Sequence, residues 1–309
     1  MSSSVSFSTL DVFTPTPFKG NQLAVVHVTL AAPLSQRTKQ AIAREFNFSE
    51  TVFLHEQEAF SSEQRLDIFT TSEELPFAGH PTIGTICNIC QNAEPPLESV
   101  KLRIKAGSIL GRYDSDSGIA EAEMPHSIRV HQALVPRKAV ITSQPALSEI
   151  AGSLPSLPLV SITKGVSFVL VDLSSVSASL GKLRAERQTV DHDAIAQDEG
   201  WGPSFIGVYY FVIVSQFDDM TRIQCRMMEE SIGEDPATGA AACTLASYLS
   251  LKDGKANQTY RYVLDQGVHM GRASEIHVKV GLDGSGKTVD SVILAGSAVL
   301  VTKGTLRLP

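Results

Sequence analysis

Two segments far apart in the chain have the same unusual composition, and they limit the folds that the chain can adopt. Residues 77–82 read FAGHPT and residues 234–240 read EDPATGA. Each combines an ionisable side chain with Pro and Gly just before a small-residue stretch that predicts a helix. Free N–H groups and the positive dipole end attract anions at a helix start. Two such helix starts facing one another would hold a small carboxylate, which predicts an enzyme with a cleft between two similar halves.

The bulk composition is typical of an enzyme built from two domains. The chain has 309 residues, of which 43% are hydrophobic and 19% charged, and domains commonly hold about 150 residues. The formal net charge of −7 argues against a nucleic-acid or anionic-membrane partner. Residues 1–5 have no basic region followed by an apolar stretch, so we expect no secretory signal. The four cysteines are expected to be reduced, which predicts a cytoplasmic location.

Alternating strands and short helices are predicted for the first half. A helix is predicted from Ser35, which suits an N-cap, to about Phe46. The predicted strands are residues 7–13, 22–28, 50–55, 65–71, 99–105, 107–113 and 119–124. A small-residue helix is predicted to begin within residues 77–82.

The second half repeats this plan. Residues 136–158 are rich in Pro and Ser and are predicted to be irregular. Strands are predicted at residues 159–163, 167–173, 205–216, 222–228, 260–266, 275–280, 291–295 and 297–302, with the second helix after residue 238. The sequence therefore predicts an α+β fold of two pseudo-equivalent domains, residues 1–126 and 127–309, with a terminal strand that can pack back on the first domain.

Metal and nucleotide sites are not expected. The spacing of Cys87 and Cys90 matches half a zinc site, but no second pair follows, and both fit the apolar stripe of one helix. Residues 281–288 read GLDGSGKT and satisfy a phosphate-loop pattern, yet the residues that follow predict a strand where that motif needs a helix. A hairpin turn is the better interpretation. Residues 191–193 read DHD and are interpreted as a polar helix start rather than as metal ligands.

Glu50 is a candidate acid/base. It lies where the first helix ends and a strand begins, between Phe48 and Val52. A lone Glu at such a junction is most simply a solvated turn residue. Apolar neighbours could instead desolvate it, which is the usual way to make a Glu basic enough for proton transfer. Taken singly, His80 is more often structural, and Asp235 is most simply a carboxylate at a helix N-terminus.

Taken together and in order, several motifs resemble the PhzF-like phenazine-biosynthesis isomerase family. They are DVFT at residues 11–14, GNQLAV at 20–25, SETVF at 49–53, ELPFAGHPT at 74–82, EDPATG at 234–239 and QG with MGR at 266–272. The resemblance implies the diaminopimelate-epimerase-like fold, in which the strands of two similar domains each surround a central helix. It also implies cofactor-independent isomerisation of a small, anionic substrate, a homodimer, and no metal.

Carried over residue by residue, the resemblance makes Glu50 the catalytic acid/base and His80 and Asp235 its polar partners. Ser49, Gly79 and Gly239 would line the substrate site. The family often has Ser at the second helix start where this chain has Ala240, so a hydroxyl expected to contact substrate is missing. Neither helix start carries Cys, which argues against the two-thiol racemisation of related epimerases. A repurposed cyclase or epimerase, and a non-catalytic ligand-binding protein on the same fold, stay open as alternatives.

Overall fold

The computed structural model describes residues 4–57, 61–187, 190–218 and 220–308. Residues 1–3 lie outside these ranges, and they belong to the stretch in which no secretory signal is expected. The chain divides into two compact units, Met1–Glu123 with Leu294–Pro309, and Met124–Ile293. The sequence analysis predicts the first of these boundaries between residues 126 and 127. In the described ranges no helix is long and apolar enough to cross a membrane.

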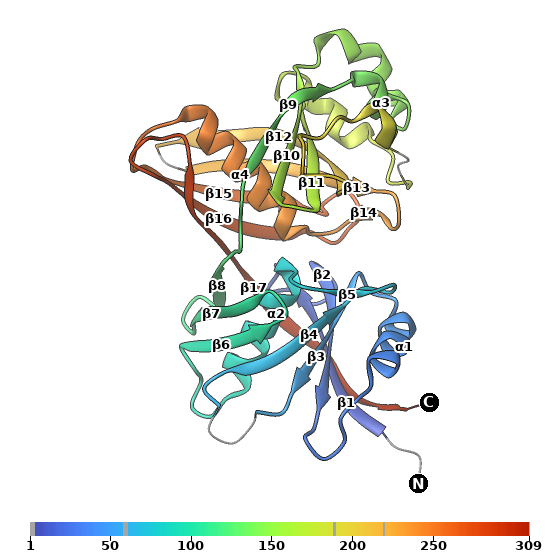
Figure 1. The fold of residues 1–309 in the computed structure, drawn as a ribbon, viewed down its shortest axis with the longest axis vertical. Helices are drawn as coiled ribbons and strands as arrows, with labels where there is room; N and C mark the ends of the chain where they lie inside the picture. Colours follow the sequence, from blue (N-terminus) through green and yellow to red (C-terminus); the bar gives the residue numbers. More distant parts are fainter. Residues whose placement is uncertain (1–3, 58–60, 188–189, 219, 309) are drawn as a thin grey trace. The chain divides into compact units, whose positions relative to one another are not determined.

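In the first unit, strands close into a ring around one helix, α2 (Gly79–Asn92), as Figure 1 shows. Around the ring, each strand pairs with the next in the order β1, β2, β3, β4, β6, β7, β8 and β17, and β17 pairs with β1. The strands are β1 (Ser4–Val12), β2 (Asn21–Val28), β3 (Glu50–His55), β4 (Gln64–Phe69), β6 (Ser99–Ile104), β7 (Gly107–Asp114), β8 (Ile119–Glu123) and β17 (Val289–Arg307), with the short β5 (Glu74–Leu75) beside β4.

Small residues let α2 fit inside this ring. Cys87 and Cys90 are fully buried, as the apolar stripe predicts, so they belong to the core. A Cβ on Gly84 would lie 2.7 Å from side-chain atoms of both Val12 and Leu23, too close for any real contact. The sequence of α2 is therefore dictated by the space that the surrounding strands leave.

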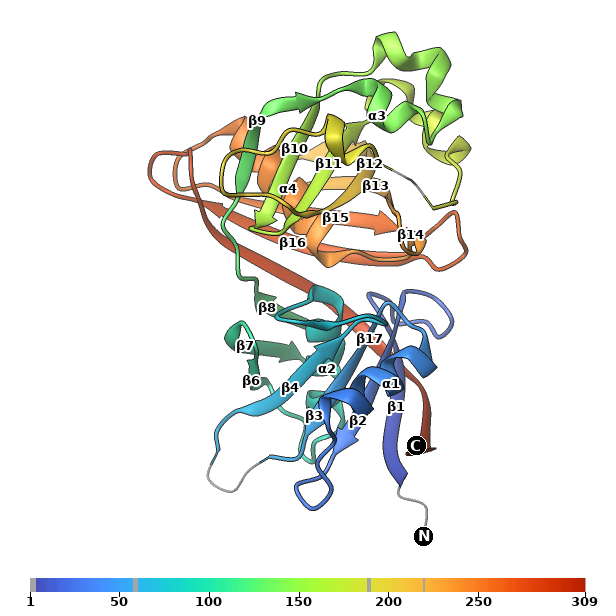
Figure 2. The same ribbon diagram turned by 45° about the vertical axis from the view of Figure 1, so that its right-hand side comes forward.

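Helix α1 (Gln36–Phe46) lies outside the ring, against β3 and β4 (Figure 2). Ser35 caps it by accepting a hydrogen bond from the Thr38 N–H, and Asn47 ends it with a left-handed φ of 52°, as the sequence predicts for this helix. Its polar face is bound to the sheet by a buried ion pair between Lys39 and Asp67.

The second unit builds a comparable arrangement around α4 (Gly239–Asp253). The helix packs against β10, β11, β15 and β16. Pairing connects β9 (Arg129–Val135), β10 (Leu157–Thr163), β11 (Val166–Asp172), β12 (Phe205–Phe217), β13 (Met220–Glu229), β15 (Thr259–Gln266) and β16 (Ser274–Leu282) in that order, and β14 (Gly233–Asp235) lies beside β13. Its remaining elements are α3 (Arg137–Ile141) and three 3-10 segments, Pro145–Ser153, Ser174–Lys182 and His192–Ala194.

Three predictions about these elements are wrong. Strand β9 is absent from the prediction, and residues 136–158 hold α3, a 3-10 segment and the start of β10 rather than irregular chain. Residues 291–302 form part of one strand, β17, instead of two strands broken at Gly296. Gly296 serves close packing, because a Cβ there would lie 2.4 Å from the Phe13 ring.

The predicted turn at residues 281–288 is confirmed. It joins β16 to β17, which are neighbours in the sheet. The Asp283 carboxylate accepts hydrogen bonds from the backbone N–H groups of Ser285 and Thr288. These N–H groups therefore bind a side chain of the turn itself, as in an ordinary Asx turn, and no helix begins at Lys287.

Candidate active site

Glu50 and His80 form a pair at the α2 start, the segment of residues 77–82. Glu50 is the first residue of β3, and His80 lies in the first turn of α2. His80 Nδ1 is 3.3 Å from Glu50 Oε2, and the two side chains are 5% and 18% exposed. The solvated-turn interpretation of Glu50 is therefore wrong, since the residue is mostly shielded and paired with an imidazole. The carboxylate still keeps a path to solvent.

His80 is held in its neutral form. Burial lowers the pKa of His80, and this outweighs the Glu50 carboxylate and a hydrogen bond to the Gln22 backbone, which raise it. A neutral imidazole carries one N–H and leaves its other ring nitrogen as an acceptor. Within the described part of the chain, His80 Nε2 is buried without a hydrogen-bond partner. The first turn of α2 thus carries an unused polar atom.

The predicted substrate-binding residues of the first unit lie next to this pair in the chain. Gly79 is buried and begins α2, and Ala78 is its N-cap without a side-chain capping bond. Ser49 precedes Glu50 and is half-buried, with its Oγ 3.5 Å from Asn21 Oδ1. The backbone N–H groups of the first turn of α2 therefore have no capping side chain in competition with an anion.

In the second unit, at the α4 start (residues 234–240), Asp235 is positioned by a strand and not by a helix. It ends β14, which pairs with β13, whereas the N-cap of α4 is Thr238. Asp235 Oδ2 accepts a hydrogen bond from Thr238 Oγ1. The interpretation of Asp235 as a simple helix N-terminal carboxylate is therefore wrong. Gly239 is buried as the first residue of α4, and Ala240 follows it, half-buried.

Gln266, at the end of β15, organises the α4 start, a role that the sequence pattern did not reveal. Its Nε2 donates to the Asp235 backbone carbonyl at 2.8 Å and to Thr238 Oγ1 at 3.0 Å. Gly267 follows with a φ of +70°, and a Cβ there would lie 2.6 Å from the Pro236 carbonyl. Only Gly satisfies both conditions. The QG pair is visible as a motif, but its contact with the α4 start depends on tertiary structure.

A buried ion pair lies beside the same helix start. Arg226 on β13 binds Glu234 through two hydrogen bonds, of 2.8 and 2.6 Å. The remaining guanidinium nitrogen donates to the carbonyls of Leu180 and Leu183. Every part of this buried charge is compensated, so Glu234 serves to fix β14 and is not available as a proton carrier.

The cysteines offer no thiol chemistry. Burial raises the pKa of Cys87 and of Cys225 to about 12, and it raises the pKa of Cys243 as well. A thiol is nucleophilic only as a thiolate, so these side chains stay protonated and inert at neutral pH. Their protonation supports the expectation that two-thiol racemisation is not the mechanism.

A serine–histidine–aspartate set in the second unit is structural. His131 Nε2 is 2.9 Å from Ser161 Oγ, and the Asp198 backbone N–H donates to His131 Nδ1 at 2.9 Å. Since Nδ1 accepts, the ring proton of neutral His131 sits on Nε2 and points at the serine. Ser161 is fully buried and also binds Ser167. The histidine cannot take a proton from this serine, so the set does not form a hydrolytic triad.

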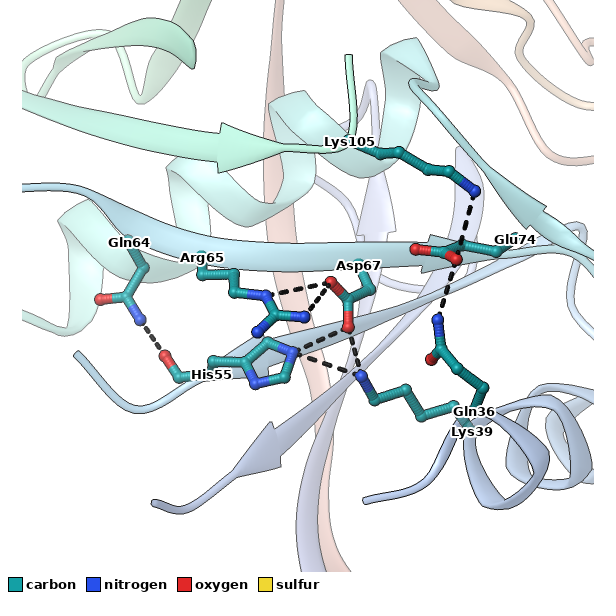
Figure 3. Close-up of polar contacts among 8 residues, drawn as sticks. All are labelled: Gln36, Lys39, His55, Gln64, Arg65, Asp67, Glu74 and Lys105. Carbon is teal, nitrogen blue, oxygen red and sulfur yellow. Dashed lines mark hydrogen bonds and ion pairs between the residues drawn. The ribbon is translucent and has the colours of Figure 1, made fainter. Parts of the chain in front are cut away.

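The first unit also contains a cavity of about 210 Å³, and none of the predicted site residues lines it. Lys39, His55 and Arg65 are among its lining residues, and Figure 3 shows their side chains converging on the Asp67 carboxylate. Burial alone would raise the pKa of Asp67, but the hydrogen bonds from His55 and Lys39 hold it far below its usual range. These charged side chains pair with one another, and the cluster fixes α1 to β3 and β4.

The structure places the predicted site residues in two sets. Ser49, Glu50, Gly79 and His80 belong to the first unit, and Asp235, Gly239 and Ala240 to the second. That both sets serve one substrate stays a prediction. In the described ranges no group of His, Cys, Asp and Glu side chains has the arrangement of a metal site.

Comparisons with known proteins identify the family of this chain. Residues 10–304 match the model of the family described as phenazine biosynthesis-like protein, PhzC-PhzF. The chain belongs to this family. An uncharacterized isomerase of Mesorhizobium japonicum is 30% identical over 304 residues, which cover 96% of each chain. The trans-2,3-dihydro-3-hydroxyanthranilate isomerase of Pseudomonas fluorescens is 29% identical over 303 residues, covering 97% of this chain and 98% of that one.

A solved structure supports the fold. The PhzF-family phenazine biosynthesis protein of Bacillus anthracis superposes with a TM-score of 0.77 over 99% of this chain and 100% of its own, at 18% identity. The expectations of an α+β, PhzF-type fold and of family membership are confirmed. With its relatives named as isomerases, this PhzF family member is an enzyme of the isomerase class.

Proposed function

We propose that this protein is a cofactor-independent isomerase that moves a proton on a small carboxylated or enolic substrate, with Glu50 as acid/base. The observation that carries the proposal is the Glu50–His80 pair, in which a mostly shielded carboxylate lies 3.3 Å from a buried imidazole. Membership of an isomerase family supports the reaction class. A protein that only bound a ligand would have no need of such a pair.

In the proposed reaction, an oxygen of ionised Glu50 removes a proton from a substrate carbon. The electron pair of the broken C–H bond moves into the adjacent unsaturated system, and the same carboxyl group returns the proton to another carbon. No atom or electron is gained or lost overall. His80, with Nδ1 3.3 Å from Glu50 Oε2, would hold the carboxylate in place. A positioned acid/base of this kind typically contributes about 10²–10⁴-fold to the rate.

The N-terminal turns of α2 and α4 are proposed to hold the anionic part of the substrate. Their N–H groups are polarised by helices of 14 and 15 residues. Such N–H groups stabilise a carboxylate and the negative charge that develops during proton removal. Asp235 would accept a hydrogen bond from a substrate hydroxyl or ammonium group.

The first substrate to test is trans-2,3-dihydro-3-hydroxyanthranilate, because relatives carry the name of an isomerase acting on it. Ala240 favours a different substrate in the same class, since it supplies no hydroxyl where the family pattern often has one. An epimerase or cyclase that keeps Glu50 is the second candidate, and Ala240 is the observation that favours it. We also propose a cytoplasmic homodimer, as family membership suggests, and light scattering would test the dimer.

Incubating candidate substrates with the protein in deuterated water tests the proposal. An isomerase should introduce deuterium at a substrate carbon, detected by mass spectrometry, and prior treatment with EDTA should leave the rate unchanged. A ligand-binding protein would leave every C–H bond unlabelled while still changing the chemical shifts of the compound it binds. Loss of labelling with EDTA, restored by one metal, would overturn the metal-free mechanism.

A further inference from the structure

Gln266 uses every hydrogen-bonding position of its side chain on the α4 start and its support. Its Oε1 accepts from Tyr209 OH at 3.0 Å and from the Thr238 backbone N–H at 3.3 Å. Its Nε2 donates to the Asp235 carbonyl and to Thr238 Oγ1. Since the side chain is fully buried, water does not compete for these positions. A carboxamide has two donor and two acceptor positions, so this one is saturated and its orientation is fixed.

These contacts give the hydrogen bonds one direction. Thr238 Oγ1 accepts from Gln266, so its only proton goes to Asp235 Oδ2. On the other side, Tyr209 donates to Gln266, and the Cys225 thiol lies 2.9 Å from the Tyr209 oxygen and 3.5 Å from the Asp265 carbonyl, to which it can donate. Burial raises the pKa of Tyr209 and of Cys225 well above neutrality. Both therefore keep their protons, and the direction does not reverse at physiological pH.

We infer that Gln266 is a positioning residue that orients the Thr238 hydroxyl toward Asp235 and thereby keeps that carboxylate ionised and fixed as a hydrogen-bond acceptor. The inference deepens the proposed function, on which it rests only for the claim that Asp235 meets the substrate. A hydrogen bond donated to a carboxylate favours its charged form. Without Gln266, the hydroxyl could rotate and donate to a backbone carbonyl instead.

The alternative is that Gln266 merely ties β15 to the α4 start. The two interpretations differ in what happens to Asp235. If Gln266 only connects β15 to the α4 start, its loss weakens folding but leaves the titration of an intact Asp235–Thr238 pair unchanged. A positioning residue that is lost changes the titration, because the donated hydrogen bond is no longer held in place.

The test is a pH titration of the Asp235 carboxyl carbon by NMR, without substrate, in protein labelled with ¹³C-aspartate. The Asp235 resonance is assigned by its absence in Asp235→Asn. Thr238→Val removes the donor, and we expect it to raise the pKa of Asp235 by about one unit, a tenfold fall in its acid dissociation constant. Gln266→Met should raise it in the same direction. Thr238→Ser keeps the hydroxyl and should titrate like the wild type.

The double variant Gln266→Met/Thr238→Val decides between the interpretations. If Gln266 acts through Thr238, the double variant should titrate like Thr238→Val alone. An unchanged titration in Gln266→Met, or shifts that simply add in the double variant, would overturn the inference. Should Gln266→Met fail to fold, Gln266→Glu keeps the acceptor contacts with Tyr209 and Thr238. A wild-type Asp235 titration in that variant would equally refute the role.

Failure of the proposed function gives a different result. If no substrate is labelled in deuterated water but the titrations shift as expected, Gln266 positions Asp235 and the isomerase proposal fails. If labelling occurs and the titrations do not shift, the isomerase stands and Gln266 is structural. In an active protein, Gln266→Met should also move the acidic limb of the kcat/KM profile to higher pH, which Thr238→Ser should not do.

Discussion

The starts of α2 and α4 differ in how fully their polar groups are satisfied. At the α2 start, Glu50 pairs with His80, while His80 Nε2 has no partner in the described part of the chain. At the α4 start, Gln266 and Thr238 form an unbroken set of hydrogen bonds that reaches Asp235. The Gln266 amide at the α4 start is thus saturated within the protein, whereas the α2 start keeps a buried imidazole nitrogen that makes no such bond.

This difference has an energetic meaning. A buried polar atom without a partner costs about 1–3 kcal/mol, and a protein tolerates it most readily where a ligand can supply the missing bond. In the proposed reaction, the α2 start would meet the reacting part of the substrate, where hydrogen bonds change as a proton moves. The α4 start would only hold the substrate.

The largest expected effect is a loss of kcat at the α2 start. Glu50→Gln should lower kcat about 10²–10⁴-fold, because it removes only the ability to exchange a proton. Its thermal midpoint should stay close to that of the wild type. Glu45→Gln, on the exposed face of α1, is the matched control and should keep full activity. A Glu50→Gln enzyme with more than half of the wild-type rate would show that the two helix starts do not divide the work in this way.

A second prediction compares, by urea unfolding, the saturated amide at the α4 start with buried hydroxyl groups that lack a partner. Gln266→Met should destabilise the second unit by about 2–3 kcal/mol, because it leaves the partners of a saturated amide unpaired. Thr51→Val, on β3, removes a buried hydroxyl that has no partner among the described residues. It nearly keeps the side-chain shape, so its cost should stay below about 0.5 kcal/mol. Ser247→Ala removes another unpartnered hydroxyl, on α4. It should resemble Thr51→Val, and a cost as large as that of Gln266→Met would break the comparison.

The third prediction is a pH dependence. Burial lowers the pKa of His80 in the first unit and of His131 in the second. The unfolded chain therefore binds protons first as the pH falls below about 6.5, so stability is lost on acidification, by at most about 1.4 kcal/mol per pH unit for each histidine. Urea midpoints measured from pH 7.5 to 5 should fall less steeply for His80→Gln and for His131→Gln than for the wild type. Parallel curves for all three proteins would contradict the neutral assignment.

The smallest effect on stability is expected at Ala240. Ala240→Ser should change the free energy of unfolding by no more than about 0.5 kcal/mol, since a half-buried hydroxyl can be hydrated. Its effect should appear in substrate choice, measured as the ratio of kcat/KM between trans-2,3-dihydro-3-hydroxyanthranilate and any other accepted compound. An unchanged ratio would mean that the residue after Gly239 does not face the substrate.

The sequence could predict what depends on local pattern. Helix α1 with its Ser35 cap, the strands with clear alternation and the helix starts around His80 and Asp235 are all local features, and the motifs around them identify the family. The turn at residues 281–288 was also predictable, because its flanking residues are β-branched.

What depends on long-range packing could not be predicted. Gly296 looks like a strand breaker until the Phe13 ring is seen against it, a contact between the two ends of the chain. Asp235 looks like a helix cap because β14 is only three residues long. Gln266 looks like any polar strand residue until Thr238 and Tyr209 are found around it. For Gly296 and Gln266, the partner that decides the role is distant in sequence.

The pairing of β17 with β1 and β8 affects the order in which the protein can be completed during synthesis. The residues that close the ring around α2 begin at Leu294 and are therefore synthesised only after the whole second unit. A nascent chain that already contains Glu50 and His80 has only an open sheet to shelter them. The second unit is continuous in sequence and can be complete before the first one closes. The proposed acid/base is thus translated well before the residues that complete its enclosure.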